Sequence, residues 1–146
     1  MPDILHRVGI SASTESVYDA LSTIEGLSRW WIVGASGSTR LGGTIHFRTD
    51  GGGVDLQVLD FALNRFVKWK CIGGPPEWIG TEIHLQLESR REQTIVMLTH
   101  SGWRDATEFM HQSSTKWATY LLSLKGWLER SEGRPFPYDI KIHVGD

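Results

Sequence analysis

The sequence is poor in cysteine, since Cys71 is the single one in 146 residues. One thiol excludes an internal disulfide framework and a zinc cluster built from cysteines. No apolar run approaches the roughly 18–20 residues that a membrane-spanning helix needs. The N-terminus has no basic region followed by an apolar stretch, so we expect no signal peptide. These absences together predict a cytoplasmic protein.

Neither sign of charge is in large excess. Lys and Arg number 15 and Asp and Glu number 17, so the formal net charge is −2. This balance does not favour binding to nucleic acid or to an anionic membrane. The six histidines include no pair at HxH or HExxH spacing, and no glycine loop opens a helix as a phosphate-binding loop does. We therefore expect no nucleic-acid partner, no membrane insertion, no metal and no other cofactor.

Tryptophan and glycine, by contrast, are abundant, with 7 Trp and 16 Gly. Many of the glycines are clustered between short apolar runs, a pattern typical of turns in antiparallel sheets. The tryptophans predict a large apolar interior or a pocket lined by rings. The length fits one domain, and no linker or repeat interrupts it. We interpret residues 1–146 as a single domain.

Apolar periodicity predicts the order of the elements. A strand over 4–10 precedes a helix capped by Ser13, and a short helix or tight turn over 27–31 follows an interruption at Gly26. Alternation with a period of two then predicts a series of strands. A polar face opposite the apolar one indicates an antiparallel sheet covered on one side. The predicted strands are 44–48, 54–60, 66–71, 81–88 and 94–101.

A long helix follows the last strand. Asp105 and Glu108 are spaced as in a capping box, and large apolar residues then recur at three- and four-residue spacing. Gly133, with two prolines after it, predicts the end of the helix. We expect this helix to lie across the open face of the sheet. Residues 138–146 alternate again and predict either an extra edge strand or a covering tail.

Three stretches of this sequence carry a resemblance to a known family. The helix after Ser13 is followed by Trp30-Trp31, and Trp69 ends a strand after a turn with Arg65. Residues 94–102 read Thr-x-Val-x-Leu-Thr-His-x-Gly, and a helix containing Trp117 follows. In order and spacing they resemble the START and birch-pollen-allergen (SRPBCC) superfamily. Within it, they are most similar to the branch related to activators of the ninety-kilodalton heat-shock chaperone's ATPase.

The resemblance spans residues 4–131 and implies an α+β helix-grip fold. In this fold a curved antiparallel sheet of six or seven strands wraps around a long C-terminal helix, with two short helices after the first strand. Lipid carriers, hormone receptors, cyclases and co-chaperones share the fold, so the resemblance does not assign a function.

A helix laid over a strongly curved sheet leaves room for a cavity, and we predict that this one binds a ligand. Apolar walls with a few convergent polar groups are typical of small-molecule sites; the alternative is that the same rings fill the core. His100, Tyr120 and Ser113 are the polar groups expected to face the cavity, although for His100 a structural hydrogen bond is the favoured role. The predicted wall residues are Trp31, Phe47, Val58, Trp69, Cys71, Leu85, Met97, His100, Trp117, Tyr120 and Leu121.

Our first functional hypothesis is a binding protein for a small apolar or aromatic molecule, acting as a monomer or homodimer. A stress-related, co-chaperone-like interaction module is one alternative. Co-chaperones of that branch work through an additional domain, so we do not expect a chaperone partner for this chain. A polyketide cyclase or dehydratase-like enzyme is the other alternative. It would need an acid–base pair facing the cavity, for which His100 and Tyr120 are the only candidates, so no catalytic residue is assigned and binding is favoured over catalysis.

Overall fold

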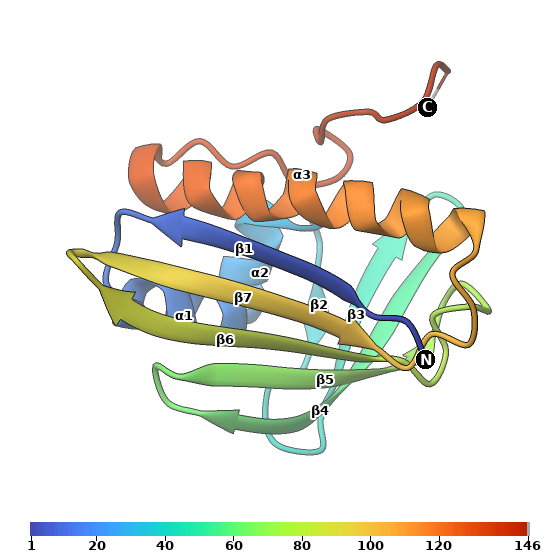
Figure 1. The fold of residues 1–146 in the computed structure, drawn as a ribbon, viewed down its shortest axis with the longest axis horizontal. Helices are drawn as coiled ribbons and strands as arrows, with labels where there is room; N and C mark the ends of the chain where they lie inside the picture. Colours follow the sequence, from blue (N-terminus) through green and yellow to red (C-terminus); the bar gives the residue numbers. More distant parts are fainter. Residues whose placement is uncertain (146) are drawn as a thin grey trace.

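A single curved antiparallel sheet and one long helix dominate the computed structural model, which describes residues 1–145 (Figure 1). The helices are α1 (Thr14–Ser22), α2 (Ile24–Trp30) and α3 (Glu108–Arg130). The seven strands are β1 (Ile4–Ile10), β2 (Ser36–Gly37), β3 (Thr44–Thr49), β4 (Gly52–Ala62), β5 (Phe66–Gly73), β6 (Glu82–Arg90) and β7 (Gln93–Ser101). This arrangement confirms the predicted α+β helix-grip fold.

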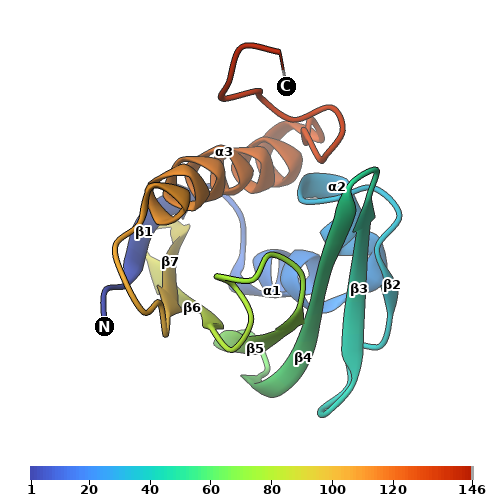
Figure 2. The ribbon, with the colours of Figure 1, turned by 90° about the vertical axis from the view of Figure 1, so that its right-hand side faces the viewer.

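The sheet order explains how the helix is gripped. Strands β2 to β7 follow one another as neighbours, and β1 pairs with β7 at the far edge. Figure 2 shows the sheet curling from β1 through β5 to β3, with α3 across the open side. Two register shifts between β4 and β5 interrupt the ladder, and such irregularities increase local bending and twist. The concave face therefore surrounds an interior that α3 closes.

The alternation predicted for the strands fixes which side chains enter this interior. Ile83 and Leu85 of β6 are fully buried, as the period of two requires. Met97 of β7 is an exception to our predicted walls, because its side chain is 46% exposed while its neighbours Val96 and Leu98 are buried. Residues 95–98 of this strand are all apolar, so alternation there does not show which face is inward. The prediction that Met97 lines the interior is wrong.

The starts of the first two helices are set by side-chain caps. Ser13 caps α1 as predicted, accepting a hydrogen bond from the Ser16 N–H at 3.1 Å. Thr23 caps α2 in the same way. Gly26 therefore lies inside α2 rather than interrupting it. A Cβ on Gly26 would come within 2.7 Å of the Ala20 Cα, so glycine lets the two helices pack closely.

Both ends of α3 differ from the prediction by two residues. Thr107, rather than Asp105, is the N-cap, and its hydroxyl accepts from the Met110 N–H at 3.2 Å. Ser131 ends the helix in the left-handed conformation in place of Gly133. Gly133 instead lets the chain after α3 pass close to the backbone of α2, since a Cβ there would lie 2.0 Å from a backbone oxygen of that helix. Within residues 1–145, no helix is both long and apolar enough to cross a membrane.

The C-terminal tail turns back over the outer side of α3 (Figures 1 and 2). Residues 138–145 form no strand, so the edge-strand alternative is wrong for them; residue 146 lies outside the described residues. Two backbone hydrogen bonds join Phe136 to the chain beside α2. Asp139 then packs against α3 with 6% of the residue exposed. Pro135 and Pro137 lack the N–H groups that a strand ladder requires.

Candidate functional site

The centre of the interior is filled by aromatic rings. The Trp31 ring lies 4.5 Å from that of Phe47, 4.9 Å from Trp117 and 5.9 Å from Trp69, measured between ring centroids. Tyr120 is 6.4 Å away. These separations are those of packed aromatic pairs. We call these five residues the central ring cluster; they join the end of α2 to β3, β5 and α3.

The other predicted wall residues surround this cluster. Val58, Cys71, Leu85 and Leu121 are all buried in the same core. Burial raises the pKa of the Cys71 thiol, which leaves it as a small apolar group rather than a nucleophile. The structure thus brings together every predicted wall residue except Met97.

His100 forms a hydrogen-bonded chain through the core. The Trp117 indole N–H donates to His100 Nδ1 at 3.0 Å. Because Nδ1 accepts, the ring carries its proton on Nε2, which lies 2.8 Å from Thr81 Oγ1 and donates to it. The Thr81 hydroxyl in turn donates to the backbone carbonyl of Trp78. Burial lowers the pKa of His100 to about 3, so the imidazole is neutral at pH 7.

Trp78 covers this chain at one end of the grip. Its ring stacks on Trp117 at 6.1 Å with an interplanar angle of 11°, and meets the edge of His100 at 4.6 Å. Its indole N–H donates to Ser113 Oγ at 3.0 Å. Trp103 completes the enclosure, 5.0 Å from His100. We call Trp78, His100, Trp103, Ser113 and Trp117 the mouth cluster; Trp117 belongs to both clusters.

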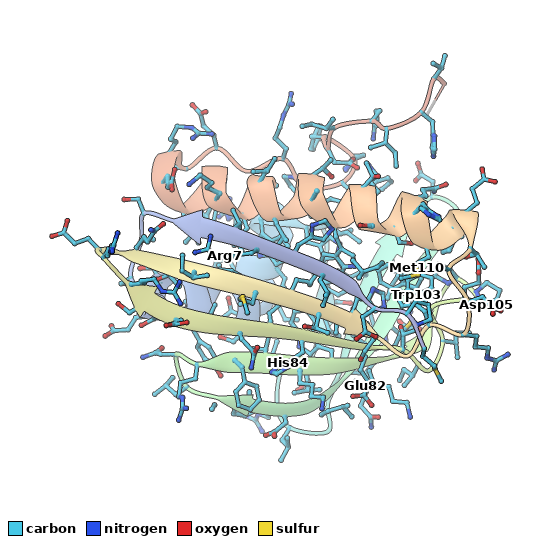
Figure 3. The ribbon with its side chains drawn as sticks, in the orientation of Figure 1. Arg7, Glu82, His84, Trp103, Asp105 and Met110 are labelled. Carbon is cyan, nitrogen blue, oxygen red and sulfur yellow. The ribbon has the colours of Figure 1, made fainter. Side chains whose placement is uncertain are left out.

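Two surface pockets flank the loop that carries Trp78, which joins β5 to β6 and stands at the front of the interior in Figure 2. One has a volume of about 520 Å³ and lies between Pro75 and the β3–β4 hairpin at Gly52. The other, of about 260 Å³, lies between Glu77 and the segment containing Trp103 and Asp105. Figure 3 places Trp103 and Asp105 at the same end of the grip, near the start of α3. Open space therefore lies on both sides of this loop, and Trp103 of the mouth cluster lines the smaller pocket.

Trp103 contributes a polar group that the protein does not satisfy. Its indole N–H is buried and has no hydrogen-bond acceptor among residues 1–145. A buried donor without an acceptor costs about 1–3 kcal/mol, so such groups merit a functional explanation. His84 Nε2 is the other unpartnered atom of this kind in the described chain, but it belongs to the polar face of β6, away from the mouth (Figure 3).

Tyr120 and His100, the two acid–base candidates, belong to separate networks. The Tyr120 hydroxyl donates to Asp139 Oδ2 at 3.0 Å, and burial together with this neighbouring carboxylate raises the pKa of Tyr120. Burial by itself would raise the pKa of Asp139. Hydrogen bonds from Lys116 and Lys141 together have the larger, opposite effect, so the pKa of Asp139 is below its usual value. Tyr120 is therefore protonated and tied to the tail, while His100 is neutral and tied to Trp117. Within residues 1–145, no group of three or more His, Cys, Asp or Glu side chains is placed to hold a metal.

Sequence reasoning missed Trp78, Trp103, Thr81 and Asp139. Trp78 did carry a signal, because it is a large ring in a short loop bounded by Gly73-Gly74-Pro75-Pro76 and Gly80. A ring in such a loop has no strand or helix face to bury it and must pack across the molecule. The roles of Thr81 and Asp139 depend on distant partners, and no local pattern points to them.

A curved sheet gripping a long helix, with a ring-filled interior and an aromatic mouth, defines a helix-grip protein of the SRPBCC type. The family described as Activator of Hsp90 ATPase homolog 1-like protein matches residues 11–129, and the chain belongs to this family.

Solved structures agree with this family. The chain is 47% identical to Aha1 from Colwellia psychrerythraea, whose solution structure is a dimer; the match covers 91% of this chain and 100% of that one, with a TM-score of 0.85. The protein SSP2350 from Staphylococcus saprophyticus is 20% identical over 90% of this chain and 95% of its own, with a TM-score of 0.77. CalU16 from Micromonospora echinospora is 22% identical over 89% and 75%, with a TM-score of 0.71. The last two show the fold alone. No curated protein matches the sequence.

Proposed function

We propose that the protein binds a small, uncharged, apolar or aromatic molecule inside the helix grip, at the mouth cluster. The observation that carries this proposal is the set of groups around His100. The Trp78 and Trp117 rings stack on each other there, the imidazole is neutral, and the buried Trp103 N–H has no acceptor. Apolar walls with a few polar groups that orient a ligand are what small-molecule sites usually present.

The predicted wall residues take different parts in this proposal. His100 and Trp117 contact the ligand directly. Cys71 and Leu85 lie deeper as part of the floor, and the central ring cluster supports them. Burying roughly 300 Å² of apolar ligand surface at about 25 cal/mol per Å² supplies about 7–8 kcal/mol before the cost of association. A micromolar dissociation constant, about −8 kcal/mol, is therefore near the upper limit.

A titration of tryptophan fluorescence with indole, checked by calorimetry, tests the proposal. Cys71→Phe is the informative variant, because the backbone of Cys71 is hydrogen-bonded to Gly80 and Thr81 directly behind the mouth. Loss of binding with stability retained would support a cavity. If the parent protein gives no response and Cys71→Phe only loses about 1–3 kcal/mol of stability by overpacking, the proposal is wrong. Trp127→Ala, on α3 but outside both clusters, is the matched control.

A second candidate function is a protein-interaction module that acts on a chaperone ATPase. Two observations favour it: the family's description names an activator of that ATPase, and the central ring cluster is already filled. Its test is the ATP hydrolysis rate of a purified Hsp90-type chaperone with and without the protein. Stimulation without indole binding would select this candidate over the first. Because the 47% identical relative is a dimer, sedimentation should be measured in parallel to test for a homodimer.

A further inference from the structure

The loop that carries Trp78 is built as a separate turn between two glycines. Gly74 and Gly80 have φ values of +132° and +90°, a region in which other residues are strained. A Cβ on Gly80 would meet nothing within 4 Å, so glycine is required there by the backbone and not by crowding. Inside the loop, the Trp78 N–H donates to the Pro75 carbonyl at 2.9 Å. Residues 75–79 therefore form one hydrogen-bonded turn.

Hydrogen bonds between side chains join this turn to α3 and to its N-cap. The Trp78 indole N–H donates to Ser113 Oγ at 3.0 Å, and the Thr107 hydroxyl donates to Glu77 Oε1 at 2.7 Å. The pockets of about 520 and 260 Å³ leave space on either side of the loop. The segment has two side-chain hydrogen bonds to α3 and its N-cap and one from Thr81, glycines near both ends and open space beside it. These are the features of a lid.

We propose that residues 74–80 are this lid, and that the Trp78 indole occupies the place of the ligand. The inference rests on the proposed function and adds the class of ligand. A ring that replaces Trp78 must be flat and fused to stack on Trp117, must be uncharged beside the neutral His100, and must carry one hydrogen-bond donor for Ser113 Oγ. Indole-like or hydroxylated bicyclic aromatics meet these three requirements.

Matched probes test the class of ligand. Indole and N-methylindole have nearly the same shape, but only indole has a donor for Ser113. We expect indole to bind at least tenfold more tightly to the parent protein, and Ser113→Ala to remove that difference. Equal affinity of both probes for the parent protein would overturn the assigned donor.

Displacement of Trp78 tests the lid. In a protein labelled with nitrogen-15 in its indoles, the Trp78 N–H signal, assigned with Trp78→Phe, should shift at saturating indole as its bond to Ser113 is lost. Trp78→Ala removes the competing ring and should bind indole at least tenfold more tightly, whereas Trp127→Ala should leave affinity unchanged. A saturated complex with an unmoved Trp78 signal would show that the lid does not open.

A reversible lock separates this inference from the proposed function. In Glu77→Cys/Thr107→Cys, the cysteines replace two side chains that are hydrogen-bonded to each other, and the native Cys71 is fully buried, so the engineered thiols are the accessible pair. The oxidised form should bind no indole and the reduced form should bind it normally. Equal binding by both forms rejects the lid and leaves the proposed function standing, while absence of binding by the parent protein rejects both. If the disulfide does not form, the shift of the Trp78 indole N–H signal at saturating indole decides whether the lid opens.

Discussion

His100 shows how a single residue can be polar and still belong to the core. It is fully buried, yet both ring nitrogens have partners, one in Trp117 and one in Thr81. Burying a polar group without partners costs free energy, whereas a fully paired one stabilises a unique arrangement. The neutral tautomer is the only form that satisfies both contacts, since a charged imidazole cannot accept from Trp117.

Stability should consequently fall in acid because of His100. The unfolded chain protonates this histidine near pH 6.5, but the folded protein does so only near pH 3. Between these values the unfolded state binds the extra proton, so the His100 contribution is lost as pH decreases, by about 1.4 kcal/mol per pH unit. Urea unfolding of the parent protein and His100→Gln over pH 3–7 measures the difference. Parallel curves for the two proteins would contradict the prediction.

Trp117 is the other residue on which the interior depends, because it joins the central ring cluster to the mouth cluster. We expect Trp117→Ala to lower the free energy of unfolding by about 3–5 kcal/mol, the usual cost of removing a large buried ring. Trp127→Ala, at a partly exposed position on the same helix, should cost less. A loss below about 1 kcal/mol for Trp117→Ala would mean that the register of α3 is wrong.

At the scale of elements, α3 holds the molecule together from both sides. Its inner face carries Trp117, Leu121 and Leu124 into the core. Its outer side receives the tail through Asp139, whose carboxylate pairs with Lys116 and is 2% exposed. One helix thus packs on the sheet through apolar contacts and on the tail through charge.

Asp139→Asn tests whether the charge of Asp139 holds the tail on α3. The substitution keeps the shape and an acceptor for Tyr120 but removes the charge paired with Lys116 and Lys141. We expect a loss of about 1–3 kcal/mol, since the ammonium groups are partly solvated and screened. Hydrogen exchange should accelerate at the Val33 N–H, which donates to the Phe136 carbonyl, and stay slow in β6 and β7. Unchanged exchange at Val33 would show that the ion pairs do not anchor the tail.

At the scale of the whole molecule, side chains of the sheet and of the helices close the interior of the described residues. The apolar core runs without a break from α1 to α3, and the histidines lack the spacing of metal ligands.

We therefore expect exhaustive dialysis against a chelator to leave the thermal unfolding curve unchanged. A metal bound only by the folded state would stabilise it by mass action, and its removal would lower the midpoint. A clear drop restored by one divalent ion would refute the expectation.

Much of the fold and part of the site were predictable. Periodicity of two and of 3.6 residues records which face of an element is buried, and it placed Phe47, Trp69 and Leu85 inside. It failed where the pattern is uniform, as around Met97, and where a helix end depends on one competing cap, as at Thr107. Both errors arose because a neighbouring residue fits the same pattern: an apolar neighbour in the case of Met97, and a second capping residue in the case of Thr107.

The sequence by itself determined the order of the elements, the inward faces of the strands other than β7 and the identity of the long helix, because these depend on residues close together in the chain. Only the tertiary structure decided that Trp78 lies on Trp117, that His100 is bound on both sides, and that Asp139 anchors the tail. Those contacts join residues brought together by the curvature of the sheet. Curvature arises from twist and register shifts summed over all seven strands, which no short stretch of sequence encodes.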